Sequence, residues 1–147
     1  MKKVIILFFS SLVFGLTFIS CNNDNNDNDS PVVASVEGKW NFSKVSETEN
    51  GVVTQPEEDY VHEAGCLKDY IELKPGGVYN EAYYSSGCVV DLTTGTWSKS
   101  GNIITITQGS DIISAEVVSV SSSMLKVKIS DTDAGITTVT TVTFTKA

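Results

Sequence analysis

Short segments in which apolar and polar residues alternate fill the chain from about residue 36 to its end. They are rich in Val, Ile, Thr and Tyr, and residues that favour turns separate them about every ten positions. A period of two places alternate side chains on one face of a strand, so the pattern is typical of half-buried antiparallel β-strands. Eight strands are predicted, over residues 40–43, 70–73, 78–85, 94–99, 103–108, 111–121, 124–130 and 136–146.

Residues 47–65 lack this alternation, and they contain Pro56 and a run of carboxylates. We therefore expect a long solvated loop there, and long loops in compact domains are often functional. His62, the single histidine of the chain, lies in this segment and is expected to be solvated. No window after residue 36 shows a 3.6-residue period, so no helix is expected.

Eight antiparallel strands joined in sequence leave two unpaired edges, which closure into a barrel removes. The predicted fold is therefore all-β, an eight-stranded antiparallel up-and-down barrel. The interior of such a barrel is either filled by its own side chains or large enough for one small ligand. The sequence is compatible with both kinds of interior, the filled one and the ligand-sized one.

Alternation directs several aromatic side chains toward this interior, where core packing is their simplest role. It places Tyr79 and Tyr83 on one face with Glu81, and it allows the opposite face, with Tyr84, to point inward instead. Tyrosines at a barrel mouth could orient an amphipathic ligand, because the ring is apolar and the phenol tip is polar. They could equally be exposed and contact a partner protein or a sugar. The candidate ligand-binding residues are Phe42, Tyr79, Tyr83, Tyr84, Trp97 and Phe144.

The first residues of the chain are typical of a secretory signal. Lys2 and Lys3 precede an apolar run over residues 4–19. The run is short of the ~20 apolar residues of a membrane span, although a retained anchor is an alternative. Residues 22–30 consist only of Asn, Asp and one Ser, a composition that cannot pack and indicates a tether.

The run that ends Phe18-Ile19-Ser20-Cys21 resembles the signal of bacterial lipoproteins, which is cleaved before a cysteine that carries diacylglyceride. The resemblance implies a signal peptide over residues 1–20, a tether over 21–35 with lipidated Cys21, and a domain over 36–147. Phe18 departs from the leucine that such signals prefer. Several acyl chains would anchor the protein to the outer membrane. The Asp-bearing stretch after Cys21 resembles a signal for surface exposure, and a plain solvated linker is the alternative.

With Cys21 lipidated, Cys66 and Cys88 remain, and we expect them to form a disulfide. This bond would close a loop of about 23 residues and stabilise the fold by roughly 3 kcal/mol. A redox-active dithiol usually has its cysteines two residues apart, and the spacings match no zinc finger. A structural bond is therefore the expected role.

The chain has ten Lys plus Arg residues, all of them lysine, against 18 acidic residues, and its formal net charge is −8. This sign opposes binding to a phosphate backbone, so no nucleic-acid partner is expected. One histidine excludes multi-histidine metal sites, and no G-x-S-x-G motif is present. We expect no enzyme, no metal and no cofactor.

Gly38-Lys39-Trp40 resembles the G-x-W opening of lipocalins, whose tryptophan packs across the closed end of the barrel. With the features that follow it, the chain over 36–147 is similar to the small lipocalin-like domains of bacterial lipoproteins. The resemblance implies a membrane-anchored barrel that binds a small hydrophobic or amphipathic ligand. The chain has no arginine to cover Trp40, its strands are short and the C-terminal helix is absent. A side-chain-filled barrel that serves as a structural, protein-binding or glycan-binding module of the envelope is the alternative. Besides Gly38-Lys39-Trp40, the features that carry the resemblance to the lipocalin-like domains are Cys66, Gly76-Gly77-Val78-Tyr79, Cys88, Gly95-Thr96-Trp97, Asn102-Ile103-Ile104-Thr105-Ile106 and Thr143-Phe144-Thr145.

Overall fold

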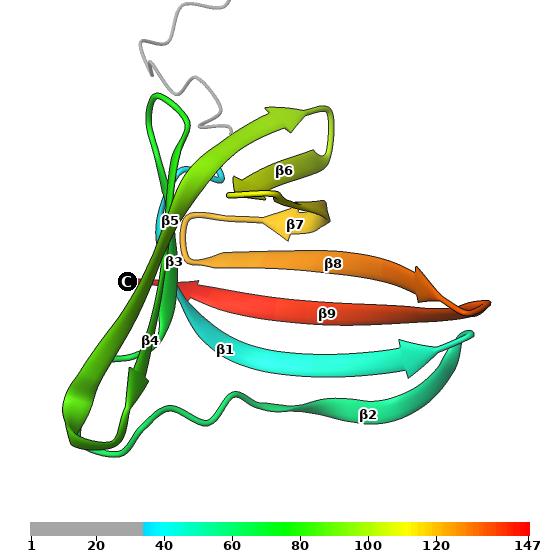
Figure 1. Cartoon of the computed structure of the whole chain (residues 1–147), viewed down its shortest axis with the longest axis horizontal. Helices are drawn as coiled ribbons and strands as arrows, with labels where there is room; N and C mark the ends of the chain where they lie inside the picture. The colour runs from blue at the N-terminus through cyan, green and yellow to red at the C-terminus, as the bar shows by residue number, and fades with distance from the viewer. Residues whose placement is uncertain (1–33) are drawn as a thin grey trace, which may run out of the picture. The chain divides into compact units, whose positions relative to one another are not determined.

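The computed structural model describes residues 34–147, so the expected signal peptide, Cys21 and nearly all of the tether lie outside the described residues. This part of the chain is almost entirely β-structure (Figure 1). None of its helices is long and apolar enough to cross a membrane. The elements are β1 (Gly38–Glu49), β2 (Val52–Asp59), β3 (Tyr70–Lys74), β4 (Val78–Ser85), the 3₁₀ turn η1 (Ser86–Cys88), β5 (Val89–Ser100), β6 (Ile103–Gln108), β7 (Asp111–Val120), β8 (Met124–Asp133) and β9 (Ile136–Lys146).

The strands close into a barrel. From β3 to β9 each strand pairs with the next one in the chain, and β1 pairs with both β3 and β9. All pairings are antiparallel, so β1 and β3 to β9 form a closed ring of eight strands, which confirms the predicted architecture. Because the strands run up and down in turn, the β3–β4, β5–β6 and β7–β8 turns share one end with Trp40. We call this the Trp40 end and the opposite one the hairpin end.

The expectation of a loop over residues 47–65 is wrong for most of that segment. β1 continues to Glu49, and the second half of β1 forms a hairpin with β2. Asn50 and Gly51 connect the two strands with φ values of 48° and 81°, the left-handed geometry of a two-residue hairpin turn. β2 pairs only with β1, and an edge strand tolerates Pro56 because one side of its backbone needs no partner. It is a ninth strand beside the ring.

Only residues 60–69 remain as a loop, and His62 fixes it rather than being solvated as expected. The Asp69 N–H donates to His62 Nδ1 at 3.1 Å, so that nitrogen carries no proton. Nε2 then donates to the Phe42 carbonyl at 3.0 Å. The His62 imidazole therefore joins the loop to β1, because each of its two nitrogens is hydrogen-bonded to a main-chain group.

A disulfide and a buried carboxylate hold the same loop. Cys66 and Cys88 are bonded with a Cα–Cα distance of 5.2 Å, which confirms the predicted disulfide and joins the loop to the β4–β5 connection. Asp69 is only 4% exposed. It accepts hydrogen bonds from the Tyr60 hydroxyl at 3.0 Å and from the Tyr84 N–H at 2.7 Å. The loop is thereby attached to β4 as well as to β1.

Trp40 is completely buried at its end of the barrel, and a lysine covers it. Its Nε1 donates to the Val36 carbonyl at 2.8 Å, and the Lys146 ammonium lies 4.0 Å from the centre of its rings. Lys146 also donates to the Glu37 carbonyl at 2.8 Å. Gly38 has φ 126°, and a Cβ there would lie 2.1 Å from Lys146 Nζ. Glycine is therefore required both by its backbone angle and by the space that the ammonium occupies.

Candidate ligand-binding site

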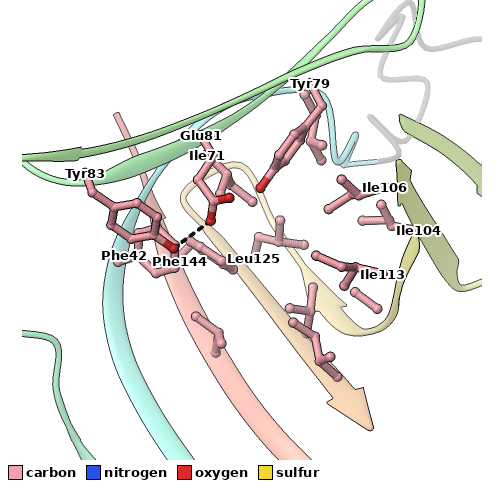
Figure 2. Close-up of a pocket in the computed structure, with 15 residues that line it drawn as sticks. Phe42, Ile71, Tyr79, Glu81, Tyr83, Ile104, Ile106, Ile113, Leu125 and Phe144 are labelled. Carbon is pink, nitrogen blue, oxygen red and sulfur yellow. Dashed lines mark hydrogen bonds between the residues drawn. The ribbon is translucent and has the colours of Figure 1, made fainter. Parts of the chain in front are cut away.

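β4 presents Tyr79, Glu81 and Tyr83 to the interior. All three line one cavity, which selects the first of the two faces that alternation allowed (Figure 2). The opposite face carries Val78, which is 45% exposed. Burial of aromatic surface explains why the face with Tyr79 points inward. Tyr79 is only 2% exposed, and its ring is one of the largest that the strands direct into the barrel.

The cavity has a volume of about 220 Å³ and lies inside the barrel. Its wall is aliphatic and aromatic on nearly every strand of the ring, and β6, β7 and β8 contribute mainly Ile, Leu and Val side chains (Figure 2). Glu81 is its only charged residue. The lining residues are Phe42, Ile71, Leu73, Tyr79, Glu81, Tyr83, Ile104, Ile106, Ile113, Ala115, Leu125, Val127, Ile129, Val142 and Phe144.

An aromatic cluster forms one wall of the cavity. The Phe42 ring stacks on Tyr83 with 5.7 Å between ring centres and packs against Phe144 at 4.8 Å. Tyr60, from the 60–69 loop, stacks on Phe42 at 4.9 Å. Since Tyr83 is 40% exposed, the cluster extends from the cavity to the surface. The anchored loop thus contributes a third ring, Tyr60, that packs against Phe42 in this wall.

Glu81 is held by two donors. The Tyr83 hydroxyl donates to one carboxylate oxygen at 2.6 Å, and Gln108 Nε2 donates to the other at 3.1 Å. A distance of 2.6 Å is within the range of O–H donors to an ionised acceptor. Burial, followed by Glu81, raises the pKa of both Tyr79 and Tyr83. The Tyr83 phenol therefore stays protonated at neutral pH and remains the donor in its hydrogen bond to Glu81.

Four of the six candidate residues meet at this cavity, namely Phe42, Tyr79, Tyr83 and Phe144. The other two do not line it. Tyr84 is half-buried on the far side of β4, and Trp97 lies near the Trp40 end, where its Nε1 donates to the Lys74 carbonyl at 2.9 Å. Trp97 packs against the core instead.

Sequence reasoning did not single out the aliphatic residues of β6 to β9 or Glu81 as site residues. Their alternation was visible, but nothing in it separates residues around a cavity from residues of a filled core. Within residues 34–147 no three His, Cys, Asp or Glu side chains are grouped so that they could hold a metal ion.

Solved structures of low sequence identity share this fold. A lipocalin-like protein from Bacteroides uniformis ATCC 8492 is 15% identical, with a TM-score of 0.55 over 76% of this chain and 97% of that one. An uncharacterized protein from Bacteroides eggerthii DSM 20697 is 12% identical, with a TM-score of 0.50 over 76% and 98%. Apocrustacyanin C1 is 11% identical, with a TM-score of 0.51 over 80% and 64%. At these identities the likeness concerns the fold alone.

No curated protein sequence matches the chain. The family model of the lipocalin-like domain, by contrast, matches residues 36–127, which run from the start of the barrel into β8. The match covers more than half of the chain, and it includes Gly38 and Trp40 with the geometry described above. The chain therefore belongs to the lipocalin-like domain family.

Proposed function

We propose that the barrel binds a small ligand with an apolar body inside its cavity. The observation that carries this proposal is a cavity of about 220 Å³ lined mainly by apolar side chains of the core. Protein interiors are normally packed to the density of organic crystals, with few voids larger than a water molecule. An apolar cavity of about 150 Å³ stays dry and binds benzene, so this one has room for an aromatic ring with a short substituent.

The alternative, a filled barrel that displays its loops to a protein or glycan, predicts no saturable uptake of such a molecule. We choose phenethyl alcohol as a neutral probe, and its binding would be measured by isothermal titration calorimetry. Saturable binding with one site per chain and a negative heat-capacity change is expected, because apolar surface becomes buried. Absence of heat at millimolar probe would contradict ligand binding and favour the filled barrel.

A pair of variants tests whether the probe enters the cavity. Ala115 lines the cavity and is 4% exposed, so Ala115→Leu places three additional carbon atoms in that space. Ser114→Leu introduces the same side chain on the outer face of β7. We expect Ala115→Leu to weaken binding at least about tenfold and Ser114→Leu to leave it unchanged. Equal effects of the two variants would place the probe elsewhere.

We further propose that Cys21 carries lipid and holds the protein at the outer membrane. The order of a lysine pair, an apolar run, a small residue and Cys21, followed by an Asn- and Asp-rich tract, supports this proposal. Radioactive fatty acid supplied to cells should label the wild-type protein but not the Cys21→Ser variant. Equal labelling of both would rule out this anchor.

A further inference from the structure

The cavity has one charged group, and it is a carboxylate. Glu81 lies on the inner face of β4 between the two tyrosines, so it reaches the same space as the apolar wall (Figure 2). No lysine lines this cavity. The polar part of a bound molecule would therefore meet a negative group and hydroxyl groups inside an apolar surface.

Glu81 has capacity for a further donor. A carboxylate accepts about four hydrogen bonds, and the Tyr83 hydroxyl and Gln108 Nε2 each occupy one position, one on either oxygen. The Tyr83 hydroxyl and the Gln108 amide are uncharged donors, so neither supplies a positive charge to pair with the Glu81 carboxylate. A ligand that carries its own proton donor would complete this coordination, whereas a ligand carboxylate would be repelled.

The strands that surround the cavity carry the same sign of charge toward the hairpin end. Residues directly opposite one another in an antiparallel pair share a face. Asp91 is opposite Tyr83, and Asp111 is opposite Gln108. Asp131 follows the cavity-lining Ile129 by two residues on β8. All three are exposed on the inner face, where they would attract a cation toward Glu81.

The lysines of the neighbouring strands lie on the outer face. Lys126 is opposite Thr143, and Lys128 is opposite Thr141. These two threonines are the immediate neighbours of the cavity-lining Val142, so they and the lysines opposite them point outward. Lys44, also opposite Thr143, is paired with Asp59 at 3.2 Å. The inner face near the hairpin end is thus acidic without compensation from these lysines.

We propose that the ligand class of this site is a small amphipathic ammonium compound, with its apolar body in the cavity and its ammonium group on Glu81. This inference rests on the proposed ligand binding. It excludes short fatty acids as preferred ligands, although they are equally apolar.

Three probes that share a phenyl ring separate the possibilities: phenethylamine, phenethyl alcohol and phenylacetate, each titrated calorimetrically into the purified full chain at pH 7. We expect the ammonium to bind at least about tenfold more tightly than the alcohol and phenylacetate to bind most weakly, since hydrogen bonds to charged groups are the stronger ones. Glu81→Gln, which keeps the shape of the side chain but removes its charge and replaces one acceptor oxygen by an N–H donor, should reduce ammonium binding about tenfold and leave the alcohol within about twofold.

Glu72→Gln is the matched control, because Glu72 is a carboxylate of the adjacent β3 that bonds Asn80 rather than lining the cavity. It should change neither affinity. Alcohol or phenylacetate binding as tightly as the ammonium, or an unchanged ammonium affinity in Glu81→Gln, would overturn the ligand class and leave the binding function intact. Absence of binding by all three probes would overturn both. Should Glu81→Gln fail to fold, the ranking of the probes on the wild-type protein decides alone.

Discussion

Gly38 and Lys146 offer a quantitative test of how the Trp40 end is built. Gly38→Ala forces a side chain into φ 126°, and its Cβ would lie 2.1 Å from Lys146 Nζ. The backbone conformation alone costs about 1–3 kcal/mol. Displacing the ammonium additionally removes its contact with the Trp40 ring, about 0.5–2 kcal/mol, and its hydrogen bond to the Glu37 carbonyl. We expect a total loss of about 3 kcal/mol in the free energy of unfolding.

The same substitution should be less harmful once the ammonium is gone. Lys146→Met keeps an apolar stem against Trp40 but lacks the atom that lies closest to the new Cβ. In a double-mutant cycle measured by urea unfolding with tryptophan fluorescence, Gly38→Ala should then cost about 1–2 kcal/mol less than in the wild-type background. Additive effects, within about 0.5 kcal/mol, would refute the claim that the glycine is required by the lysine.

Three further predictions concern the loop and the hairpin that the structure adds to the barrel. Replacing Cys66 and Cys88 by serine, which opens a sequence separation of 22 residues, should lower the free energy of unfolding by about 3 kcal/mol with an unchanged circular-dichroism spectrum; a loss below about 0.5 kcal/mol would argue against the chain-entropy account. Burial, then the hydrogen bond to Asp69, raises the pKa of Tyr60 to about 12, so its phenol keeps its proton longer in the folded than in the unfolded state. Stability should therefore fall as pH rises from about 10 to 12, where Tyr79 and Tyr83 contribute as well, and Tyr60→Phe should make this fall less steep in alkaline denaturation, whereas an unchanged slope would contradict the assignment. Gly51→Val, at φ 81°, should cost about 1–3 kcal/mol, and a neutral effect in thermal unfolding would mean that the turn can adopt another geometry.

The strands of the ring were predictable from the sequence because each buries only one face. Leu125 and Val127 alternate with Lys126, and both apolar residues are at most 4% exposed. β2 was missed because Pro56 and its carboxylates are typical of a loop, and an edge strand beside a barrel needs no apolar face. The Asn50-Gly51 pair was the signal that could have identified this hairpin.

The cavity itself could not be predicted from alternation. Whether inward-facing side chains fill a barrel depends on their volumes summed over all strands, including small residues such as Ala115. Glu81 points inward because it lies between Tyr79 and Tyr83 on the same face of β4. The free energy gained by directing these two rings into the barrel outweighs the cost of placing one carboxylate in an apolar cavity. The contact of Lys146 with Trp40 joins residues from the two ends of the domain sequence. They lie 106 positions apart, the difference between 146 and 40, and no local sequence pattern predicts a contact over that separation.

Methyl-group NMR during titration with phenethyl alcohol tests the central claim, that the barrel interior takes up a small apolar molecule. Ile104, Ile113 and Ile129 line the cavity, whereas Ile112 is 70% and Ile136 is 48% exposed. We predict saturable shifts of the three inner isoleucine methyl signals and unchanged signals from the two outer ones. Shifts confined to the outer residues, or no saturable shift at all, would contradict a ligand-binding interior.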